Sequence, residues 1–537
     1  MARISYTNDV FYSPLPEYGD AETLGKDEIG GNDLFYGSYD TDVSGAGDAY
    51  ALTANARGGQ DTFYGGLGGH NVFAGDASWE MTGSSRGGAD RFFGGAEAFN
   101  LFVGDAYTMV DDTKGGNDLF VGGAGAGAGT TGGSPGNIAA GDAFVMQGEA
   151  AGGDDLLTGG SDSFNVLIGE AETMSDSAAG GADRLTGGDA IGDYLPEEVD
   201  PGSFMPYALN LLLGDAGSMG TGTKGGADVV TGGSARGVGT DAFNLMSGDA
   251  VELASGVVTG NDVLTGGWAI APGAAVTNFM AGDGFIMEPT DGLSPVTVFG
   301  KDTLTGGSGV DGSGEGVQNI LFGDLGILVF PDQSPDPESG VMYGPVKGGD
   351  DTLYGGKNWA SNYLFGDAIS LEAGARGGDD TLVGGDVATQ SVLVGDAQYI
   401  AVGARGGNDR LVSGAADDWM YGDAGEYNDG VGGADRFVFA SGNGRDRILD
   451  FHASEGDKID LKAFKALNVD FNGDGIRDFQ NFSALMASGR VTLADVDGDL
   501  TVDDIVINTQ VGEASGFEIA LIGNFEMSDI SQGWFSI

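Results

Sequence analysis

The chain contains 537 residues, of which 104 are glycine, 81 are acidic and 23 are basic, and it contains no cysteine. Its formal net charge of -58 excludes nucleic acid and anionic membrane surfaces as direct partners, because binding to phosphate requires clustered Lys and Arg. Without cysteine there is neither a disulfide framework nor a thiolate-ligated metal site, whereas an apolar share of 41% is sufficient for a core.

Residues 1–27 precede the repetitive part of the chain, and we expect them to form an N-terminal cap or assembly segment. They contain no basic stretch followed by an apolar stretch, and nowhere in the chain do about 18 apolar residues occur in succession. The sequence therefore predicts neither an N-terminal signal peptide nor insertion into a membrane.

Between residues 28 and 440 a block of about 28 residues recurs about a dozen times, which is typical of a solenoid. The first anchor of each block is Gly-Gly-x-Asp-x-apolar-x-Gly-Gly, as in GGQDTFYGG and GGDDTLYGG. Its aspartates are Asp33, Asp61, Asp90, Asp118, Asp155, Asp183, Asp228, Asp262, Asp302, Asp351, Asp380, Asp409 and Asp435.

The second anchor is Asn-x-apolar-x-Gly-Asp-Ala, as in NVFAGDA and NLLLGDA. In one copy Glu170 takes the place of the aspartate. The aspartates of the other copies are Asp48, Asp76, Asp105, Asp142, Asp215, Asp249, Asp283, Asp324, Asp367, Asp396 and Asp423.

Each anchor is a short alternating apolar run bounded by glycine, and this pattern predicts a strand with a tight bend at each end. A further apolar position follows most Gly-Asp-Ala aspartates by four residues and predicts a third, weaker side of the coil with an inward-facing ladder. Its members are Leu52, Met109, Met146, Met174, Met219, Leu253, Met287, Leu371, Ile400 and Tyr427. Longer stretches at 123–136, 189–207 and 325–347 are expected to leave the coil as loops.

The segments GGNDLF, TGNDVLTGG and GGNDRLVSG resemble the repeats-in-toxin (RTX) family, in which a glycine- and aspartate-rich repeat forms a parallel β-roll around calcium. The resemblance covers roughly residues 28–440 and implies an all-β fold, a right-handed parallel β-solenoid of about 12–13 turns with a small mixed C-terminal module. Carboxylates beside glycine bends would supply the hard oxygen ligands that Ca²⁺ prefers. Both sets of aspartates are therefore candidate calcium ligands.

Two structural alternatives compete with metal binding. The aspartates could cap tight turns through their own hydrogen bonds, although two aligned carboxylate columns would repel each other without a counter-ion. The asparagines of the second anchor are better explained by an amide ladder that runs from turn to turn. They are Asn71, Asn100, Asn137, Asn165, Asn210, Asn244, Asn278, Asn319 and Asn362.

Residues 441–537 depart from the repeat and predict a separate module. The stretches DRILDFHASEGDKIDLKAF and ALIGNFEMSDISQGWFSI resemble the C-terminal module of RTX proteins. That resemblance implies export by a type I secretion machinery through an uncleaved C-terminal signal. Two loops in the module have the ligand spacing of positions 1, 3, 5 and 9 of an EF-hand, although Asn481 and Val506 stand where its glutamate belongs. Their candidate ligands are Asp470, Asn472, Asp474 and Asp478 in the first loop, and Asp495, Asp497, Asp499 and Asp503 in the second.

Catalytic motifs do not account for the chain. A zinc peptidase requires His-Glu-x-x-His, and the two histidines, His70 and His452, stand in no such setting. A hydrolase elbow of the Gly-x-Ser-x-Gly type is not found in the required strand-to-helix context. We expect no enzyme activity, and a solenoid carbohydrate-active enzyme is the less favoured alternative.

The function predicted from these features is that of a secreted, extracellular or cell-surface structural protein that folds on Ca²⁺ and assembles with copies of itself into a layer, filament or matrix. The alternative is a calcium-dependent adhesin that binds cell-surface glycan through apolar loops such as residues 327–331.

Overall fold

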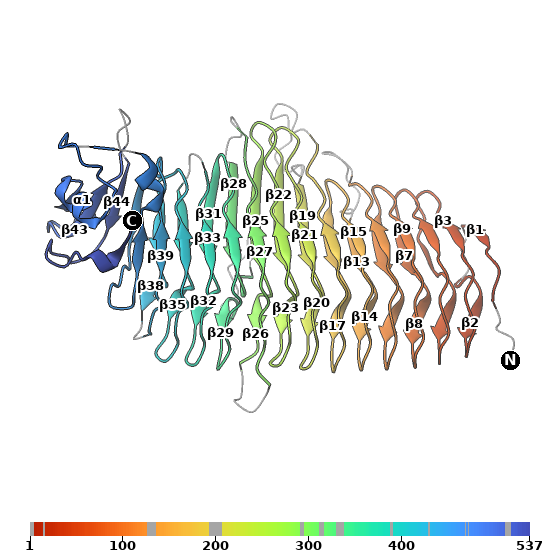
Figure 1. Ribbon diagram of the computed structural model, residues 1–537. Coiled ribbons are helices and arrows are strands. Elements are labelled where there is room, and N and C mark those ends of the chain that lie inside the picture. Colours follow the sequence, from red (N-terminus) through yellow and green to blue (C-terminus); the bar gives the residue numbers. More distant parts are fainter. Residues whose placement is uncertain are drawn as a thin grey trace.

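The structure is a computed structural model that describes residues 5–13, 15, 17–125, 136–192, 207–289, 295–310, 316–328, 338–386, 390–427, 430–467, 469–470, 472–510 and 517–537. It confirms the predicted parallel β-solenoid: short strands stack in register along a single axis, with the first turn at one end and the C-terminal module at the other (Figure 1). Each regular turn contributes one strand to each of three sides of the coil.

Sheet 1 joins sixteen of the described strands, most of them three residues long, and in most of the regular turns a glycine pair follows the strand. In spatial order they are β1 (Val10–Tyr12), β3 (Leu34–Tyr36), β6 (Thr62–Tyr64), β9 (Arg91–Phe93), β12 (Leu119–Val121), β15 (Leu156–Thr158), β18 (Arg184–Thr186), β21 (Val229–Thr231), β24 (Val263–Thr265), β27 (Thr303–Thr305), β30 (Thr352–Tyr354), β33 (Thr381–Val383), β36 (Arg410–Val412), β39 (Arg436–Val438), β41 (Lys458–Asp460) and β45 (Phe535–Ser536).

Sheet 2 also joins sixteen described strands, and in the regular turns they end at the Gly-Asp pair of the second anchor. They are β4 (Val43–Ala46), β7 (His70–Ala74), β10 (Phe99–Val103), β13 (Gly136–Ala140), β16 (Phe164–Ile168), β19 (Tyr207–Leu213), β22 (Asp241–Ser247), β25 (Ala275–Ala281), β28 (Gly316–Phe322), β31 (Ala360–Phe365), β34 (Ser391–Val394), β37 (Trp419–Tyr421), β40 (Arg445–Ile448), β44 (Glu518–Leu521), β43 (Asp504–Asn508) and β42 (Val491–Ala494).

Sheet 3 is the predicted third side and lies along the lower edge in Figure 1. It is divided into a nine-stranded and a four-stranded part, which meet where residues 325–347 interrupt the repeat. The strands are β2 (Ala21–Leu24), β5 (Ala49–Leu52), β8 (Ala77–Met81), β11 (Ala106–Met109), β14 (Ala143–Met146), β17 (Ala171–Met174), β20 (Ala216–Met219), β23 (Ala250–Leu253) and β26 (Ile286–Met287), then β29 (Val341–Met342), β32 (Ala368–Leu371), β35 (Ala397–Ile400) and β38 (Ala424–Tyr427).

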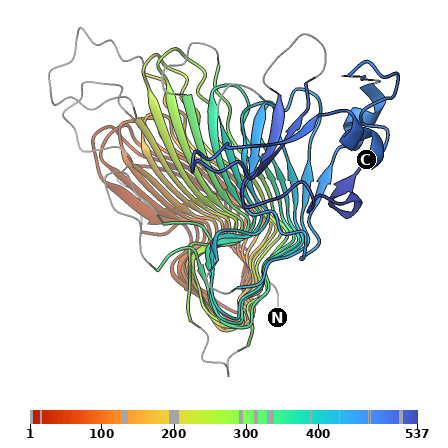
Figure 2. The ribbon, with the colours of Figure 1, turned by 90° about the vertical axis from the view of Figure 1, so that its left-hand side faces the viewer.

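Two apolar cores run along the solenoid, and alternation along each strand explains them. Inward residues of sheets 1 and 2, such as Phe63, Phe73 and Leu167, form one core with exposures of 2% or less. Ala106 and the predicted Met and Leu ladder of sheet 3 form the other. The ladder prediction is thus confirmed, except at Tyr427, whose side chain lies outside the described residues. Seen along the axis, a broad upper part narrows to a smaller lower part (Figure 2).

The coil extends past both boundaries predicted from the sequence. In the segment predicted as an N-terminal cap or assembly segment, β1 pairs in parallel with β3, and β2 with β5, so these residues already form a turn. After residue 440, β40, β41, β44 and β45 continue sheets 1 and 2 in parallel. The solenoid therefore has more turns than the 12–13 predicted. Most of the three predicted insertions lies outside the described residues, which omit 126–135, 193–206 and 329–337.

The C-terminal module closes one end of the coil. Its strands β42 and β43 pair antiparallel with each other, and β43 pairs antiparallel with β44. Its helices are Lys462–Leu467 (3-10), α1 (Phe482–Ala487) and Gln532–Trp534 (3-10). Asn481 caps α1 by accepting a hydrogen bond from the backbone N–H of Ala484. None of the helices in the described segments is long and apolar enough to cross a membrane.

Candidate metal centre

The aspartates of the first anchor form a continuous buried column, column A, at the start of the sheet 1 strands. Oδ1 of each carboxylate accepts a hydrogen bond from the backbone N–H of the aspartate one turn earlier; for example, Asp61 N donates to Asp90 over 2.6 Å, and Asp90 N donates to Asp118 over 2.6 Å. The other oxygen, Oδ2, is buried and has no hydrogen-bond partner among the described residues. This holds for Asp33, Asp61, Asp90, Asp118, Asp155, Asp183, Asp228, Asp262, Asp302, Asp351, Asp380, Asp409 and Asp435.

The acidic residues of the second anchor form column B, between the ends of the sheet 2 strands and the starts of the sheet 3 strands. One carboxylate oxygen accepts a hydrogen bond from a glycine N–H of the next glycine pair, as Asp76 does from Gly88 over 2.7 Å and Asp105 from Gly116 over 2.9 Å. In most members the second oxygen is buried without a partner in the described part of the chain. Those members are Asp48, Asp76, Asp105, Asp142, Glu170, Asp249, Asp283, Asp324, Asp367 and Asp396.

The two columns face each other across the interior, between the two apolar cores. Carboxylate oxygens of Asp48, Asp61 and Asp76 all lie within 4.8 Å of one another. The same is true of the triads Asp76–Asp90–Asp105 and Asp105–Asp118–Asp142. Because Asp76 and Asp105 each belong to two triads, adjacent turns share carboxylates, and the three clusters form a line along the axis from Asp48 to Asp142.

Glycine makes this approach possible. A Cβ on Gly58 would overlap the carboxylate of Asp76, and a Cβ on Gly59 would overlap the carbonyl oxygen of Gly31 in the preceding turn. The Gly-Gly pair therefore stands where the wall of the coil touches both a carboxylate and the neighbouring backbone. This is the physical reason that the repeat couples glycine to aspartate.

Burial shifts the acid–base equilibrium of both columns. Desolvation raises the pKa of Asp33 to about 6 and that of Asp142 to about 7. Desolvation and then the neighbouring charges of Asp61 and Asp76 raise the pKa of Asp48 well above its usual range. Charged carboxylates in this setting cost several kcal/mol each unless a cation or a proton neutralises them.

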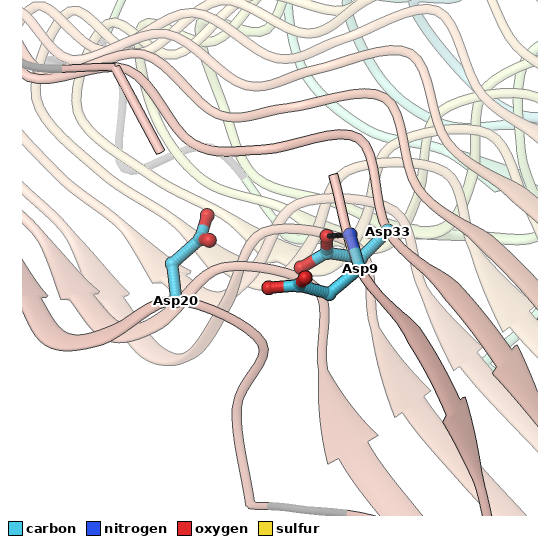
Figure 3. A group of neighbouring side chains, drawn as sticks. All are labelled: Asp9, Asp20 and Asp33. Atoms are coloured by element: carbon cyan, nitrogen blue, oxygen red, sulfur yellow. Dashed lines mark hydrogen bonds between the residues drawn. The ribbon is translucent and has the colours of Figure 1, made fainter. Parts of the chain in front are cut away.

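The N-terminal turn contains a cluster that the sequence reasoning missed. Asp9, Asp20 and Asp33 have carboxylate oxygens within 4.8 Å of one another, and they come from the first and second turns (Figure 3). Asp9 is exposed, Asp20 is half-buried and Asp33 is buried, so this cluster opens to solvent at the end of the coil. The signal was present: Asn8-Asp9-Val10-Phe11-Tyr12 copies Asn32-Asp33-Leu34-Phe35-Tyr36, and Gly19-Asp20-Ala21 copies Gly47-Asp48-Ala49.

The predicted asparagine ladder is confirmed. Asn137 Nδ2 donates to Asn165 Oδ1 over 2.9 Å, and Asn165 Nδ2 donates to Asn210 Oδ1 over 2.8 Å. Each amide also bonds both backbone groups of a glycine, as Asn165 does with Gly160. These amides are fully used within the fold, which confirms the predicted structural role of the asparagines.

The first EF-hand-like loop is only partly assembled. Asp470 accepts hydrogen bonds from the backbone N–H groups of Gly473, Asp474 and Gly475. Asp478, by contrast, is buried against Arg490, whose Nε donates to it over 2.6 Å. The carboxylate of Asp478 is thus engaged by Arg490 in the core of the module, although its backbone N–H donates to the carbonyl oxygen of Val469, next to Asp470.

The second EF-hand-like loop brings together a different set from the one predicted. Asp495 and Asp497 cluster with the buried Asp504, with oxygens within 4.8 Å. The neighbouring Asp503 accepts a hydrogen bond from the hydroxyl of Thr501 over 2.6 Å. Asp499 is bonded to the same hydroxyl, which lowers its pKa. The start of β43 places Asp504, and not Asp503, toward the cluster.

No family model, no curated protein and no solved structure matches the chain. The chemistry of the site is therefore inferred from its geometry. The arrangement defines a class of site by itself, a buried line of oxygen-only clusters. Carboxylates with unused buried oxygens suit a hard divalent cation such as Ca²⁺, which takes six to eight oxygen ligands.

Proposed function

We propose that the chain is a calcium-binding structural protein of the RTX type whose solenoid folds when Ca²⁺ enters the line between columns A and B. The observation that carries the proposal is the pairing of two buried carboxylate columns, each with oxygens that no group of the described chain satisfies. Water and apolar cores cannot neutralise such charges, whereas divalent cations can.

Ligand sharing makes the binding of successive ions interdependent. Asp76 takes part in the clusters on both of its sides, so an ion bound on one side fixes a ligand for the next. Each turn also supplies the backbone hydrogen bonds that orient the carboxylates of its neighbour. We therefore propose cooperative binding, in which filling one cluster lowers the cost of ordering the adjacent turn.

We also propose an extracellular location, on the basis of the same calcium chemistry. Where Ca²⁺ is scarce the acidic chain stays unfolded, a state suited to passage through a type I secretion machinery. Where Ca²⁺ is abundant the columns are neutralised and the chain coils. The resemblance of residues 446–464 and 520–537 to RTX C-terminal modules supports this route.

Circular dichroism of metal-free protein, titrated with Ca²⁺, tests the proposal. We expect the β-sheet signal to develop with a sigmoidal dependence on calcium and elemental analysis of the folded protein to find many bound calcium ions. Mg²⁺ serves as a control, because it dehydrates reluctantly and demands octahedral geometry. A chain that is fully folded without metal at neutral pH, or that binds no calcium, would contradict it.

A second candidate function is binding of a glycan, and a cavity near the C-terminal end of the solenoid favours it. The predicted apolar loop is a weak candidate, because Ile327 and Leu328 pack against the solenoid and residues 329–331 lie outside the described part. A cavity of about 590 Å³ at the end of sheet 2 is lined by Trp419, Arg447 and Glu518, which offer an aromatic ring and charged groups to a sugar. A glycan array with wild-type and Trp419→Ala protein tests this, and signals that are equal or absent in both would refute it.

A further inference from the structure

The outer face of sheet 2 is unlike the rest of this acidic molecule. In β10 the residues Asn100 and Phe102 point into the core, so the intervening Leu101 must point outward. Parallel register then places Leu101, Ile138, Val166 and Leu211 in one row, which continues to Leu245 and Phe279. A single outer row of the coil is thus made of large aliphatic and aromatic side chains.

Carboxylates are almost absent from this surface, which we call the apolar face, the outward side of β7 to β37. Over these described strands, Asp241 at the start of β22 is the one outward-facing acidic residue. The outer side of sheet 3 differs, because it carries Glu22, Glu172 and Glu252 in exposed positions. In a chain of net charge -58, a face of this length with a single carboxylate is where two like molecules can approach with little contact between their carboxylates.

Sheet 1 also has an outer side without carboxylates in its regular strands, but its chemistry changes along the axis. In the N-terminal turns the outer row is a stack of Tyr36, Tyr64 and Phe93. Further along, the same row carries Thr231, Thr265 and Thr305, with Arg184 and Arg410 in the neighbouring row. Threonine and arginine hold water more firmly than leucine and valine do. Over the turns that carry the threonine row, the apolar face is therefore the better surface for burial.

The size of the apolar face also fits association. Eleven neighbouring strands from β7 to β37, about 4.8 Å apart and about five residues long, cover on the order of 900 Å². A standard interface buries about 800 Å² on each partner. The middle of the face is already covered by the chain itself, since Leu245 is 1% exposed and clusters with Phe285 and Leu328. The area open to a partner is therefore smaller than the whole face and lies on either side of this covered part. At its N-terminal end a groove of about 280 Å³ is lined by Val72, Leu101 and Tyr107, with the exposed Glu17 also in its lining, and it offers a recess for apolar side chains.

We propose that the apolar face joins two copies of this chain, sheet 2 against sheet 2, as the first contact of the assembly. Packed sheets lie about 10 Å apart and interdigitate their outward rows, which would bury the row of Leu101 and Val166. The inference rests on the proposed structural function, since it names the surface through which that function would be exercised. The occupant is a second copy, because the contact buries the same carboxylate-poor surface on both partners.

Sedimentation velocity of calcium-loaded wild-type protein and two matched variants tests the interface. Val166→Asp places a carboxylate on the apolar face, and Thr265→Asp places one on the outer side of sheet 1. We expect wild-type protein and Thr265→Asp to associate, and Val166→Asp to associate on the order of a hundredfold more weakly, because each copy would bury an unpaired charge. A monomeric wild type, or association that is lost in Thr265→Asp and kept in Val166→Asp, would overturn the proposal.

Cysteine labelling guards against a variant that fails to fold. The chain has no cysteine, so Val166→Cys and Thr265→Cys each present a single thiol. We expect a maleimide to modify Cys at 265 at all protein concentrations and to react several-fold more slowly at 166 when the protein is concentrated; equal rates would refute the interface. Circular dichroism of the same samples measures calcium-coupled folding separately. If the protein is folded without calcium and the thiol at position 166 is still protected from maleimide, the interface is supported and the folding proposal is contradicted.

Discussion

At the scale of single residues, glycine and aspartate act as one unit. The aspartate brings a carboxylate into the interior, and the glycine pair leaves room for that carboxylate and for the backbone of the preceding turn. Either residue alone predicts a different structure: glycine by itself indicates a bend, and aspartate by itself indicates a capped turn. Their combination across a turn boundary is what produces a buried cluster.

Substitution of one glycine tests this coupling. Gly59→Ala should destabilise the calcium-loaded protein by about 3 kcal/mol, because the new Cβ would overlap the carbonyl oxygen of Gly31, a backbone atom that cannot swing away. Gly136→Ala is the matched control, since the nearest atom to its Cβ is 3.6 Å away in Phe99. Thermal or denaturant unfolding measures both, and equal stabilities of the two variants would show that the close approach is not required.

Removal of one shared carboxylate should have opposite effects with and without metal. Asp76→Asn removes a buried charge, so the calcium-free protein should become more stable by about 1–4 kcal/mol. In calcium the same variant should lose stability and about two bound ions, because Asp76 belongs to two clusters. Asp112→Asn, at an exposed position, controls for the change in net charge. A shift of the same sign in both conditions would mean that Asp76 does not hold calcium.

At the scale of the elements, the periodic part of the fold was predictable and its ends were not. Alternation and glycine spacing repeat in every turn, so the strands of sheets 1 and 2, the methionine ladder and the asparagine ladder could all be predicted. The first turn was not predicted because Tyr6 and Thr7 stand where the usual glycine pair precedes the aspartate. The pairing of Asp478 with Arg490 depends on how β42 packs on the module, and no local pattern encodes that.

The carboxylate columns predict an unusual dependence on pH. A carboxyl group whose pKa is higher in the folded chain than in the unfolded chain binds more protons when folded. Raised values of about 6 for Asp283 and Asp367 and about 7 for Asp142 therefore mean that the calcium-free fold loses stability as the pH rises from about 4 to about 7.

Calcium should reverse that trend, because it binds the deprotonated carboxylates and so binds more tightly as the pH rises. Metal-free protein should show more β-sheet by circular dichroism at pH 5 than at pH 8, and calcium should restore the sheet signal at pH 8. Sodium chloride at equal ionic strength controls for general screening. A metal-free fold that is as stable at pH 8 as at pH 5 would show that the buried carboxylates are neutralised in some other way.

At the scale of the whole molecule, the two ends of the solenoid differ. At the C-terminal end the module adds β44 and β45 to two sheets, and the carboxylate of Asp450 accepts hydrogen bonds from the N–H groups of Gly422, Asp423 and Ala424, where the third sheet ends. At the N-terminal end β1 and β2 are the first described strands of sheets 1 and 3, and Asp9 faces solvent. A linear array with one capped end should open from the other.

Hydrogen exchange of the calcium-loaded protein tests this polarity. We expect the amides of β1 and β2 to exchange fastest among the strands, protection to rise over the next few turns, and the end near Asp450 to stay protected, because each inner turn is held by two neighbours. Asp450→Ala should remove the protection of Gly422 and Ala424 while leaving β3 and β5 unchanged. Uniform protection along the coil, or faster exchange beside Asp450 than at β1 in the unmodified chain, would contradict a solenoid that opens from its N-terminal end. Uniform protection would instead mean that the line of carboxylate clusters holds all turns together as one cooperative unit.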